Sequence, residues 1–215
     1  MYKAVIFDLD GTLLDTLTDL YNAVNHALRT FGFPERTIDE VRRFIGNGVK
    51  KLMERSTPEG TSEKVNAECL DCFRAHYLAH MADNTAPYEG VNELIEKLRE
   101  KGIRTAVVSN KLHSAVVDLC KDYFPLIEEA IGVSVEEERK PNPVNVVKVL
   151  DSFGISADEC IYVGDSEVDV QTSHNAGVKC IGVTWGFRDE DELIENGADF
   201  IAHTSEEVLK KVSVC

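Results

Sequence analysis

The chain has 215 residues, of which 43% are hydrophobic and 28% are charged, as is typical of a soluble globular protein with one large domain or two small ones. Its formal net charge of −15 argues against a nucleic-acid partner, because nucleic-acid phosphates are bound by cationic surfaces. No apolar run approaches the roughly 20 residues that span a bilayer, and the N-terminus lacks the pattern of a secretion signal, so we expect no membrane partner and a cytoplasmic location.

The first predicted element is a short buried strand that ends in carboxylates. Residues 5–7 are apolar and favour a strand, and Asp8 follows them at the strand's carboxyl end. A simple turn explains Asp10 with Gly11, but a partly buried Asp8 is tolerated only beside a cation or hydrogen-bond donors. We therefore expect Asp8 to be a metal ligand, a nucleophile or both.

The next stretch, residues 16–86, carries helical periodicity only. Apolar residues recur at helical spacing from Leu17 to Leu28, and Thr37 with Glu40 forms a capping box that opens a second helix. Two further helices are expected, near residues 49–55 and 62–82. We predict an α-helical cap domain, inserted between the first two core strands, that could close over a site as a lid.

From residue 87 onward, helices and strands alternate to the end of the chain. Apolar strands are expected, in order, near residues 104–108, 130–133, 160–163, 180–183 and 200–202, with helices between them. Repeated strand–helix–strand units with apolar strands predict a doubly wound parallel sheet. The predicted fold class is thus α/β, with a core domain of residues 1–15 and 87–215 and a helical cap domain of residues 16–86.

Polar side chains also follow the later strands. Ser109 and Asn110 come at the end of the second core strand, Lys140 lies just before a helix, and Asp165 directly follows the fourth core strand. Because an open α/β sheet binds ligands at the carboxyl ends of its strands, we expect these groups to converge on Asp8. Converging carboxylates raise one another's pKa unless a cation joins them, and Mg²⁺ suits carboxylate oxygens together with a substrate phosphate.

These segments resemble the four motifs of the haloacid-dehalogenase superfamily phosphatases, in the same order, from Asp8 to Asp169. Two weaker stretches, residues 44–49 and 185–188, are similar to the phosphoglycolate phosphatases within that superfamily. The resemblance implies a Rossmann-like core with an inserted helical cap, and it implies phosphatase activity.

The same resemblance implies roles for the carboxylates. Asp8 would be the nucleophile that forms an aspartyl phosphate, and Asp10 would be the general acid and base. The Mg²⁺ ligands would be the side chains of Asp8 and Asp165 with the backbone carbonyl of Asp10. Asp169 would lie near the metal and act mainly through a water molecule or neighbouring hydrogen bonds.

Further residues match the donors that a transferring phosphoryl group requires. They are the hydroxyl of Ser109, the backbone N–H of Asn110 and the ammonium of Lys140, which also offsets the charge of the carboxylates. Simpler explanations stay open for two of them, since Ser109 could cap a helix and a lysine such as Lys140 is ordinarily a surface residue.

In the predicted cap, Gly46, Asn47 and Gly48 precede a helix. The free N–H groups at the start of that helix could bind a small carboxylate such as that of glycolate. Alternatively, the two glycines could serve only to form a turn. We expect these residues to contribute to recognition of the leaving group.

The sequence thus predicts a Mg²⁺-dependent phosphomonoesterase that converts a small phosphorylated metabolite, 2-phosphoglycolate, to glycolate and phosphate. The nearest alternatives are another phosphatase of the superfamily, acting on a sugar phosphate or pyrophosphate, and a sugar phosphomutase. A non-catalytic phospho-ligand-binding protein or a receiver-type signalling module is more remote, since a receiver has no helical insertion like residues 16–86. We expect a monomer or a homodimer.

Overall fold

A computed structural model describes residues 2–214, which form two compact units. The first unit contains the described residues up to Leu14 and from Pro87 onward, and the second unit spans Asp15–Ala86. Two short strands, β2 (Leu14–Asp15) and β3 (Ala86–Pro87), pair where the chain passes from one unit to the other. No helix within residues 2–214 has both the length and the apolar composition that a membrane span requires.

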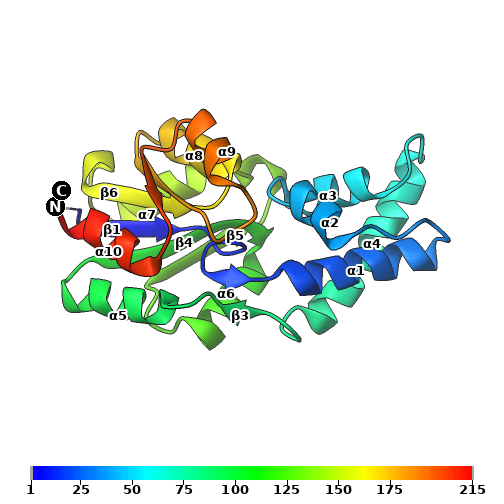
Figure 1. Ribbon diagram of the computed structural model, residues 1–215, viewed down its shortest axis with the longest axis horizontal. Coiled ribbons are helices and arrows are strands. Elements are labelled where there is room, and N and C mark those ends of the chain that lie inside the picture. The colour runs from blue at the N-terminus through cyan, green and yellow to red at the C-terminus, as the bar shows by residue number, and fades with distance from the viewer. Residues whose placement is uncertain (1, 215) are drawn as a thin grey trace. The chain divides into compact units, whose positions relative to one another are not determined.

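The described part of the first unit is built on a six-stranded parallel sheet with the strand order β5-β4-β1-β6-β7-β8. Figure 1 labels β1, β4, β5 and β6 of this sheet. Its strands are β1 (Ala4–Phe7), β4 (Arg104–Leu112), β5 (Glu129–Val133), β6 (Cys160–Gly164), β7 (Lys179–Val183) and β8 (Phe200–Ala202). The chain runs outward from β1 to β5 and then returns to β6 on the other side of β1. The predicted doubly wound parallel α/β fold is confirmed, and β1 lies at the switch point where such sheets bind ligands.

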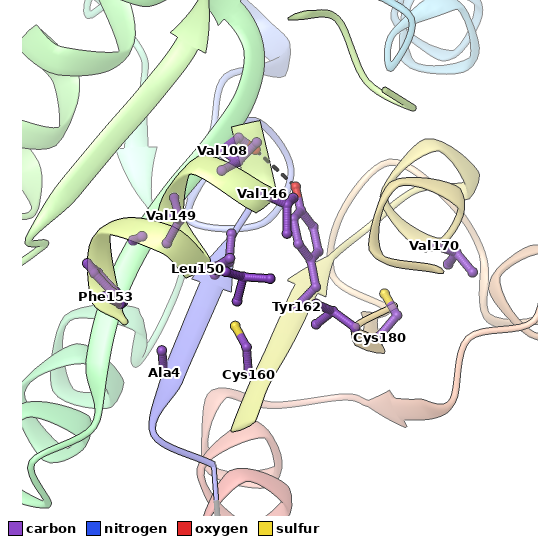
Figure 2. Packing of buried hydrophobic residues seen from close by; sticks show 13 residues of the cluster. Ala4, Val108, Val146, Val149, Leu150, Phe153, Cys160, Tyr162, Val170 and Cys180 are labelled. Atoms are coloured by element: carbon purple, nitrogen blue, oxygen red, sulfur yellow. Dashed lines mark hydrogen bonds between the residues drawn. The ribbon is translucent and has the colours of Figure 1, made fainter. Parts of the chain in front are cut away.

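Helices flank this sheet at positions close to those predicted. They are α5 (Val91–Glu100), α6 (His113–Tyr123), α7 (Val144–Phe153), α8 (Glu167–Asn175), α9 (Glu190–Glu195) and α10 (Ser205–Val214), with the 3₁₀ helices η1 (Glu136–Glu138) and η2 (Ala157–Glu159). Figure 2 shows part of the core, in which Val149 and Leu150 of α7 belong to one buried apolar cluster with Ala4 of β1 and Tyr162 of β6. Removing these side chains from water is the main force that holds α7 on the sheet.

The second unit is helical, with α1 (Leu17–Thr30), α2 (Ile38–Phe44), α3 (Gly48–Ser56) and α4 (Glu63–His80). The predicted capping box is present at the start of α2. The Thr37 hydroxyl oxygen accepts a hydrogen bond from the backbone N–H of Glu40 (3.2 Å), and the Glu40 carboxylate accepts one from the backbone N–H of Thr37 (2.8 Å). These two bonds satisfy N–H groups that the first turn of a helix leaves without partners.

A buried carboxylate joins the two ends of this helical unit. Asp19 in α1 is 3% exposed and accepts hydrogen bonds from the backbone N–H and side-chain amide of Asn84, and from the backbone N–H and hydroxyl of Thr85. These bonds run between 2.8 and 3.1 Å. Asp19 therefore fixes the start of α1 against the segment that leads into β3.

Candidate active site

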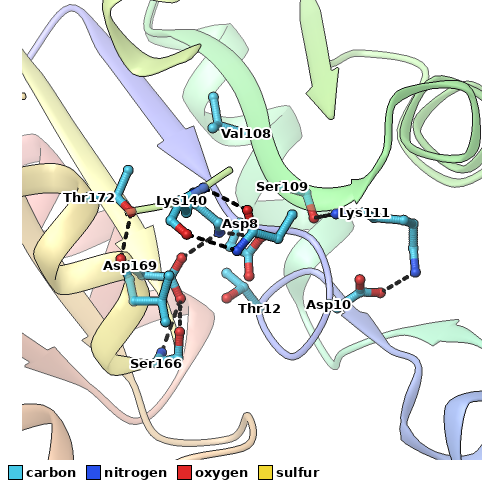
Figure 3. A network of polar contacts seen from close by, with 12 residues as sticks. Asp8, Asp10, Thr12, Val108, Ser109, Lys111, Lys140, Ser166, Asp169 and Thr172 are labelled. Carbon is cyan, nitrogen blue, oxygen red and sulfur yellow. Dashed lines mark hydrogen bonds and ion pairs between the residues drawn. The ribbon is translucent and has the colours of Figure 1, made fainter. Parts of the chain in front are cut away.

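The carboxyl ends of neighbouring strands bring together most of the core residues that the sequence analysis singled out (Figure 3). Asp8 follows β1, Ser109 lies in the last part of β4, and Asp165 follows β6. The backbone N–H of Asp8 donates a hydrogen bond to the carbonyl oxygen of Val163 (2.9 Å), which continues the pairing of β1 with β6 beyond the last residue of β1. Adjacent parallel strands thus place residues that are distant in the sequence at one edge of the sheet.

The side chains of Asp8, Asp165 and Asp169 form a buried cluster. One oxygen from each lies within 4.8 Å of the others, and the three residues are 8%, 1% and 0% exposed. Burial raises the pKa of Asp8 from 3.8 to about 7, with Lys140 opposing and the Asp169 charge adding to the rise. Burial, together with the charges of Asp169 and Asp8, also raises the pKa of Asp165 well above its usual range. Such a cluster needs compensating positive charge to be ionised.

Lys140 supplies part of that charge. Its Nζ lies 2.6 Å from Asp169 Oδ1 and 2.9 Å from Asp8 Oδ1, and the residue is only 5% exposed. Burial by itself would lower the pKa of Lys140, but the carboxylates of Asp169 and Asp8 raise it well above 10.5, so the side chain stays an ammonium. Lys140 is therefore a buried part of the cluster and not an ordinary surface lysine.

The remaining negative charge fits a hard divalent cation. Three carboxylates face one ammonium in this cluster, and the available ligand atoms are all oxygens, which Mg²⁺ and similar ions prefer. Asp8 Oδ1 is buried and has no hydrogen bond of acceptable geometry, although it lies 2.9 Å from Lys140 Nζ. Asp8 therefore keeps oxygen lone pairs that a metal ion or an electrophile could use.

The two carboxylates that follow β6 have different surroundings. Asp165 accepts one hydrogen bond at each oxygen, from the Thr12 hydroxyl (3.0 Å) and from the backbone N–H of Phe187 (2.8 Å). Asp169 accepts from Lys140 at Oδ1, and from the Ser166 hydroxyl (2.7 Å) and backbone N–H (3.1 Å) at Oδ2. Asp169 is thus more fully engaged by protein donors, which suits the indirect role that the sequence analysis predicts for it.

Asp10 lies on the other side of the loop from the Asp8–Lys140 contact (Figure 3). Its Oδ1 is 2.9 Å from the Nζ of Lys111, and the two side chains are 17% and 5% exposed. This ion pair fixes the Asp10 carboxylate two residues after the predicted nucleophile. The role of Asp10 as general acid and base stays a prediction.

The strand that carries Ser109 and Asn110 is longer than predicted. We expected it to end at Val108, but β4 continues to Leu112, with a shift of register against β5 between these two residues. Over that interval β5 advances only from Ile131 to Val133, so residues 109–111 of β4 form an irregular, bulged stretch. A bulge re-aims side chains at the edge of a sheet, and single-sequence periodicity does not reveal it.

Within the bulge, Ser109 and Asn110 have separate tasks. Ser109 is 2% exposed and its hydroxyl oxygen accepts from the backbone N–H of Lys111 (3.3 Å). It caps no helix, since the residue before α6 is Leu112. Asn110 Oδ1 accepts from the backbone N–H of Lys140 (2.7 Å), and its amide donates to the Lys140 carbonyl oxygen (3.4 Å). The side chain of Asn110 therefore fixes the backbone of Lys140, besides the phosphate-binding role predicted for its N–H.

The predicted cap residues lie in the second unit, at the start of α3. Asn47 immediately precedes this helix, and Gly46 and Gly48 have φ angles of 116° and 79°, which glycine adopts readily. Arg55 donates to the Phe44 carbonyl oxygen (2.9 Å) and to Asn47 Oδ1 (3.2 Å), so it holds the loop against its own helix. Recognition of the leaving group by residues 46–48 stays a prediction.

Two site residues were missed by sequence reasoning. Lys111, two residues after Ser109, received no role in the sequence analysis, yet it is buried beside Asp10. Tyr162 lies in the predicted strand near residues 160–163 and received no role of its own, yet its hydroxyl is 3.2 Å from Lys140 Nζ. The available signals were a lysine two residues after Ser109 and a phenol in an otherwise apolar strand.

The chain matches known proteins over most of its length. Residues 5–183 match the sequence profile of the haloacid dehalogenase-like hydrolases. A phosphoglycolate phosphatase from Aquifex aeolicus (strain VF5) is 34% identical over 190 residues, which cover 86% of each chain. A phosphoglycolate phosphatase from Vibrio parahaemolyticus is 31% identical over 226 residues, which cover 99% of this chain and 96% of the relative.

Solved structures agree with these relatives. A provisionally named phosphoglycolate phosphatase from Lactobacillus delbrueckii subsp. bulgaricus superposes with a TM-score of 0.93 at 33% identity, covering 98% of both chains. The predicted family resemblance is confirmed by this agreement of sequence and fold. The chain belongs to the haloacid dehalogenase-like hydrolases and is a phosphatase of that family.

Proposed function

We propose that this phosphatase is Mg²⁺-dependent and hydrolyses 2-phosphoglycolate, a small phosphorylated metabolite, to glycolate and phosphate through an aspartyl phosphate on Asp8. The observation that carries this proposal is the position of Asp8. Its carboxylate is buried at the end of β1, beside the Lys140 ammonium and within 4.8 Å of oxygens of Asp165 and Asp169. A carboxylate placed in this way can attack phosphorus and divide one difficult displacement into two easier ones.

Other residues of the chain would assist each half of the reaction. Lys140 and the Ser109 hydroxyl would stabilise negative charge on the phosphoryl oxygens. Lys140 is buried beside Asp8, and Ser109 is buried in β4, the strand that pairs with β1. Asp10 would give a proton to the leaving oxygen and later take one from the water that hydrolyses the aspartyl phosphate. Lys111 would hold Asp10 in place for both proton transfers.

Asp8 and Asp165 would hold the metal ion through their side chains, and Asp10 through its backbone carbonyl. A bound Mg²⁺ supplies charge neutralisation among the carboxylates and on the substrate phosphate. Asp169 would keep Lys140 in place, because its oxygens already accept from Lys140 and Ser166. The all-oxygen donor set and the excess negative charge support this assignment.

The substrate is proposed from the relatives and from the cap. The curated relatives described above are phosphoglycolate phosphatases at 31% and 34% identity. The start of α3, with Gly46, Asn47 and Gly48, offers backbone N–H groups to a small carboxylate such as that of glycolate. A carboxylate on the leaving group would distinguish this substrate from sugar phosphates.

A panel of phosphoesters tests the proposal. Mg²⁺-dependent phosphate release is measured with 2-phosphoglycolate, a sugar phosphate, a nucleotide monophosphate and pyrophosphate, for the native protein and for Asp8→Asn. We expect the highest kcat/KM with 2-phosphoglycolate, and no turnover by Asp8→Asn or in EDTA. Preference for another ester would refute the proposed substrate but not the proposed mechanism. Conversion of a sugar phosphate to its isomer would indicate a mutase.

The contribution of the cap is tested separately. Asn47→Ala and Gly48→Pro should raise KM for 2-phosphoglycolate more than KM for p-nitrophenyl phosphate, which has no carboxylate. Lys64→Ala is a matched control in the same unit, because the Lys64 side chain is 85% exposed and pairs only loosely with Glu68 at 3.9 Å. Unchanged kinetics in both loop variants would exclude this loop from substrate recognition.

A further inference from the structure

The hydroxyl of Tyr162 connects the apolar core to the active site. Tyr162 is fully buried in β6 and its ring belongs to the cluster between the sheet and α7. Its hydroxyl donates a hydrogen bond to the carbonyl oxygen of Val108 in β4 (3.0 Å), on the far side of β1, and Figure 2 marks this bond with a dashed line. The same oxygen lies 3.2 Å from Lys140 Nζ and 3.4 Å from Asp169 Oδ1.

The hydrogen-bond inventory of this group decides which way its proton points. A phenol has one proton to donate and can accept through its oxygen. The Val108 carbonyl is nearer than Asp169 Oδ1, and an ammonium can only donate, so Tyr162 donates to Val108 and accepts from Lys140. Burial raises the pKa of Tyr162 well above its usual range, so the phenol keeps this proton.

The same inventory applies to the Lys140 ammonium, which donates hydrogen bonds to Asp169 and Tyr162 and forms an ion pair with Asp8. An ammonium has three donors, and the structure places Asp169 Oδ1, Asp8 Oδ1 and the Tyr162 hydroxyl within 2.6, 2.9 and 3.2 Å of Nζ. The shortest of these contacts draws Nζ toward Asp169 and away from the nucleophile. Without a third fixed partner, the ammonium could settle on Asp169 and lose its approach to Asp8.

We infer that Tyr162 is a positioning residue for phosphoryl transfer, whose hydroxyl, fixed by the Val108 carbonyl, holds the Lys140 ammonium against Asp8. The backbone of Lys140 is held independently by the side chain of Asn110. Both supports come from the second half of β4, at Val108 and Asn110, so this strand sets the position of a lysine about 30 residues further along the chain. The kinetic consequence rests on the proposed chemistry at Asp8, whereas the position of the ammonium does not.

Tyr162→Phe removes the hydroxyl and keeps the ring. We expect kcat to fall by about 10- to 100-fold, as is common when a partner of a site residue is lost, with KM changed by less than about twofold because the phenol does not touch substrate. The matched control is Ile161→Val, which removes one methylene from a fully buried neighbour in the same strand and leaves Lys140 untouched. The control should keep the native kcat. A native kcat in Tyr162→Phe would overturn the inference.

The position of the ammonium is measured without any substrate. Buried, hydrogen-bonded ammonium groups exchange their protons slowly, so Lys140 should give a ¹H–¹⁵N signal that is identified by its loss in Lys140→Met. We expect this signal to shift or to broaden by exchange in Tyr162→Phe, while the signal of Lys111, which pairs with Asp10, stays unchanged. An unchanged Lys140 signal would refute the positioning role, even if the enzyme hydrolyses none of the proposed substrates.

A double-variant cycle separates positioning from general damage to the core. If Tyr162 acts through Lys140, adding Tyr162→Phe to Lys140→Met should change phosphate release from p-nitrophenyl phosphate by less than about twofold. The same 10- to 100-fold loss in both backgrounds would show that Tyr162 acts independently of Lys140.

Discussion

Lys111 Nζ lies 2.9 Å from Asp10 Oδ1, and this ion pair is separate from the pair that Lys140 makes with Asp8. The two lysines come from different parts of the chain, one from the bulge in β4 and the other from the loop before α7. The active site thus contains two carboxylate–ammonium pairs, one at the proposed nucleophile and the other at the proposed general acid and base. Each pair can be altered without removing the other.

Lys111→Met should lower kcat because Asp10 loses the ammonium that fixes its position. General acid–base catalysis is typically worth about 10²–10⁴-fold, and we expect the variant to lose about 10- to 100-fold of it. Steady-state kinetics with 2-phosphoglycolate measure this loss. Lys101→Met, which changes an exposed lysine after α5, should keep native activity. Equal activity of the two variants would show that Asp10 works without Lys111.

Removal of the metal ion should make the stability of the protein fall as the pH rises. The pKa of Asp8 is 3.8 when unperturbed and about 7 in the folded, metal-free protein, chiefly because of burial. Between these values the folded state binds more protons than the unfolded state, so the stabilisation is complete below pH 3.8 and is lost as the pH rises through about 7. The loss is on the order of a few kcal/mol.

Urea unfolding in EDTA at pH 5 and pH 8 measures this effect. Asp8→Asn is the reference, because it has no titrating group at this position and retains the other carboxylates. We expect the native protein to lose more stability than Asp8→Asn between the two pH values, and Mg²⁺ to remove most of the difference. A native protein that is more stable at pH 8 than at pH 5, relative to Asp8→Asn, would contradict the prediction.

Gly11→Ala should weaken metal binding. A Cβ at Gly11 would lie 2.7 Å from Asp165 Cγ, so the Asp165 carboxylate would have to move. We expect the Mg²⁺ concentration for half-maximal activity to rise by about 10- to 100-fold, the usual effect of disturbing a ligand's surroundings. A Mg²⁺ titration of the activity tests this.

Gly102→Ala is the control for backbone strain. Gly11 and Gly102 have φ angles of 88° and 71°, so both alanines pay roughly 1–2 kcal/mol for a left-handed conformation. A Cβ at Gly102 meets nothing within 4 Å. If Gly102→Ala raises the Mg²⁺ requirement as much as Gly11→Ala does, the effect comes from general destabilisation and not from Asp165.

Asp19→Ala should destabilise the second unit. The substitution leaves the buried N–H and hydroxyl of Thr85, and the partly buried donors of Asn84, without their carboxylate, which costs about 2–3 kcal/mol in the free energy of unfolding. Thermal and urea unfolding measure the loss. Asp71→Ala removes a carboxylate that is 76% exposed and pairs with Arg74 at 3.4 Å, so its effect should stay within about 0.5 kcal/mol. Equal effects of the two variants would refute a special role for Asp19.

Much of the fold followed from local pattern. The apolar strands, the helical segment of residues 16–86 and the capping box of Thr37 and Glu40 were predicted from periodicity and spacing, and the structure confirms the parallel sheet and the capping box. The predicted end of β4 was wrong. A bulge depends on how two strands pair, so it cannot be recognised from the hydrophobic pattern of one strand alone. The site residues Asp8 and Asp165 could be named because they follow strands in an α/β pattern, and Lys140, which lies in the loop before α7, was named through the family resemblance.

What the sequence determined by itself was the order of apolar strands, the carboxylates at their ends and, through them, the family. Runs of apolar residues and the turn residues that bound them are local features, so they can be recognised from the sequence alone. The tertiary structure alone decided which ammonium faces which carboxylate, so that Lys111 pairs with Asp10 while Lys140 bridges Asp8 and Asp169 and rests on the Tyr162 hydroxyl. These contacts join residues of strands, loops and a helix that are far apart along the chain, and only the packed fold brings them within hydrogen-bonding distance.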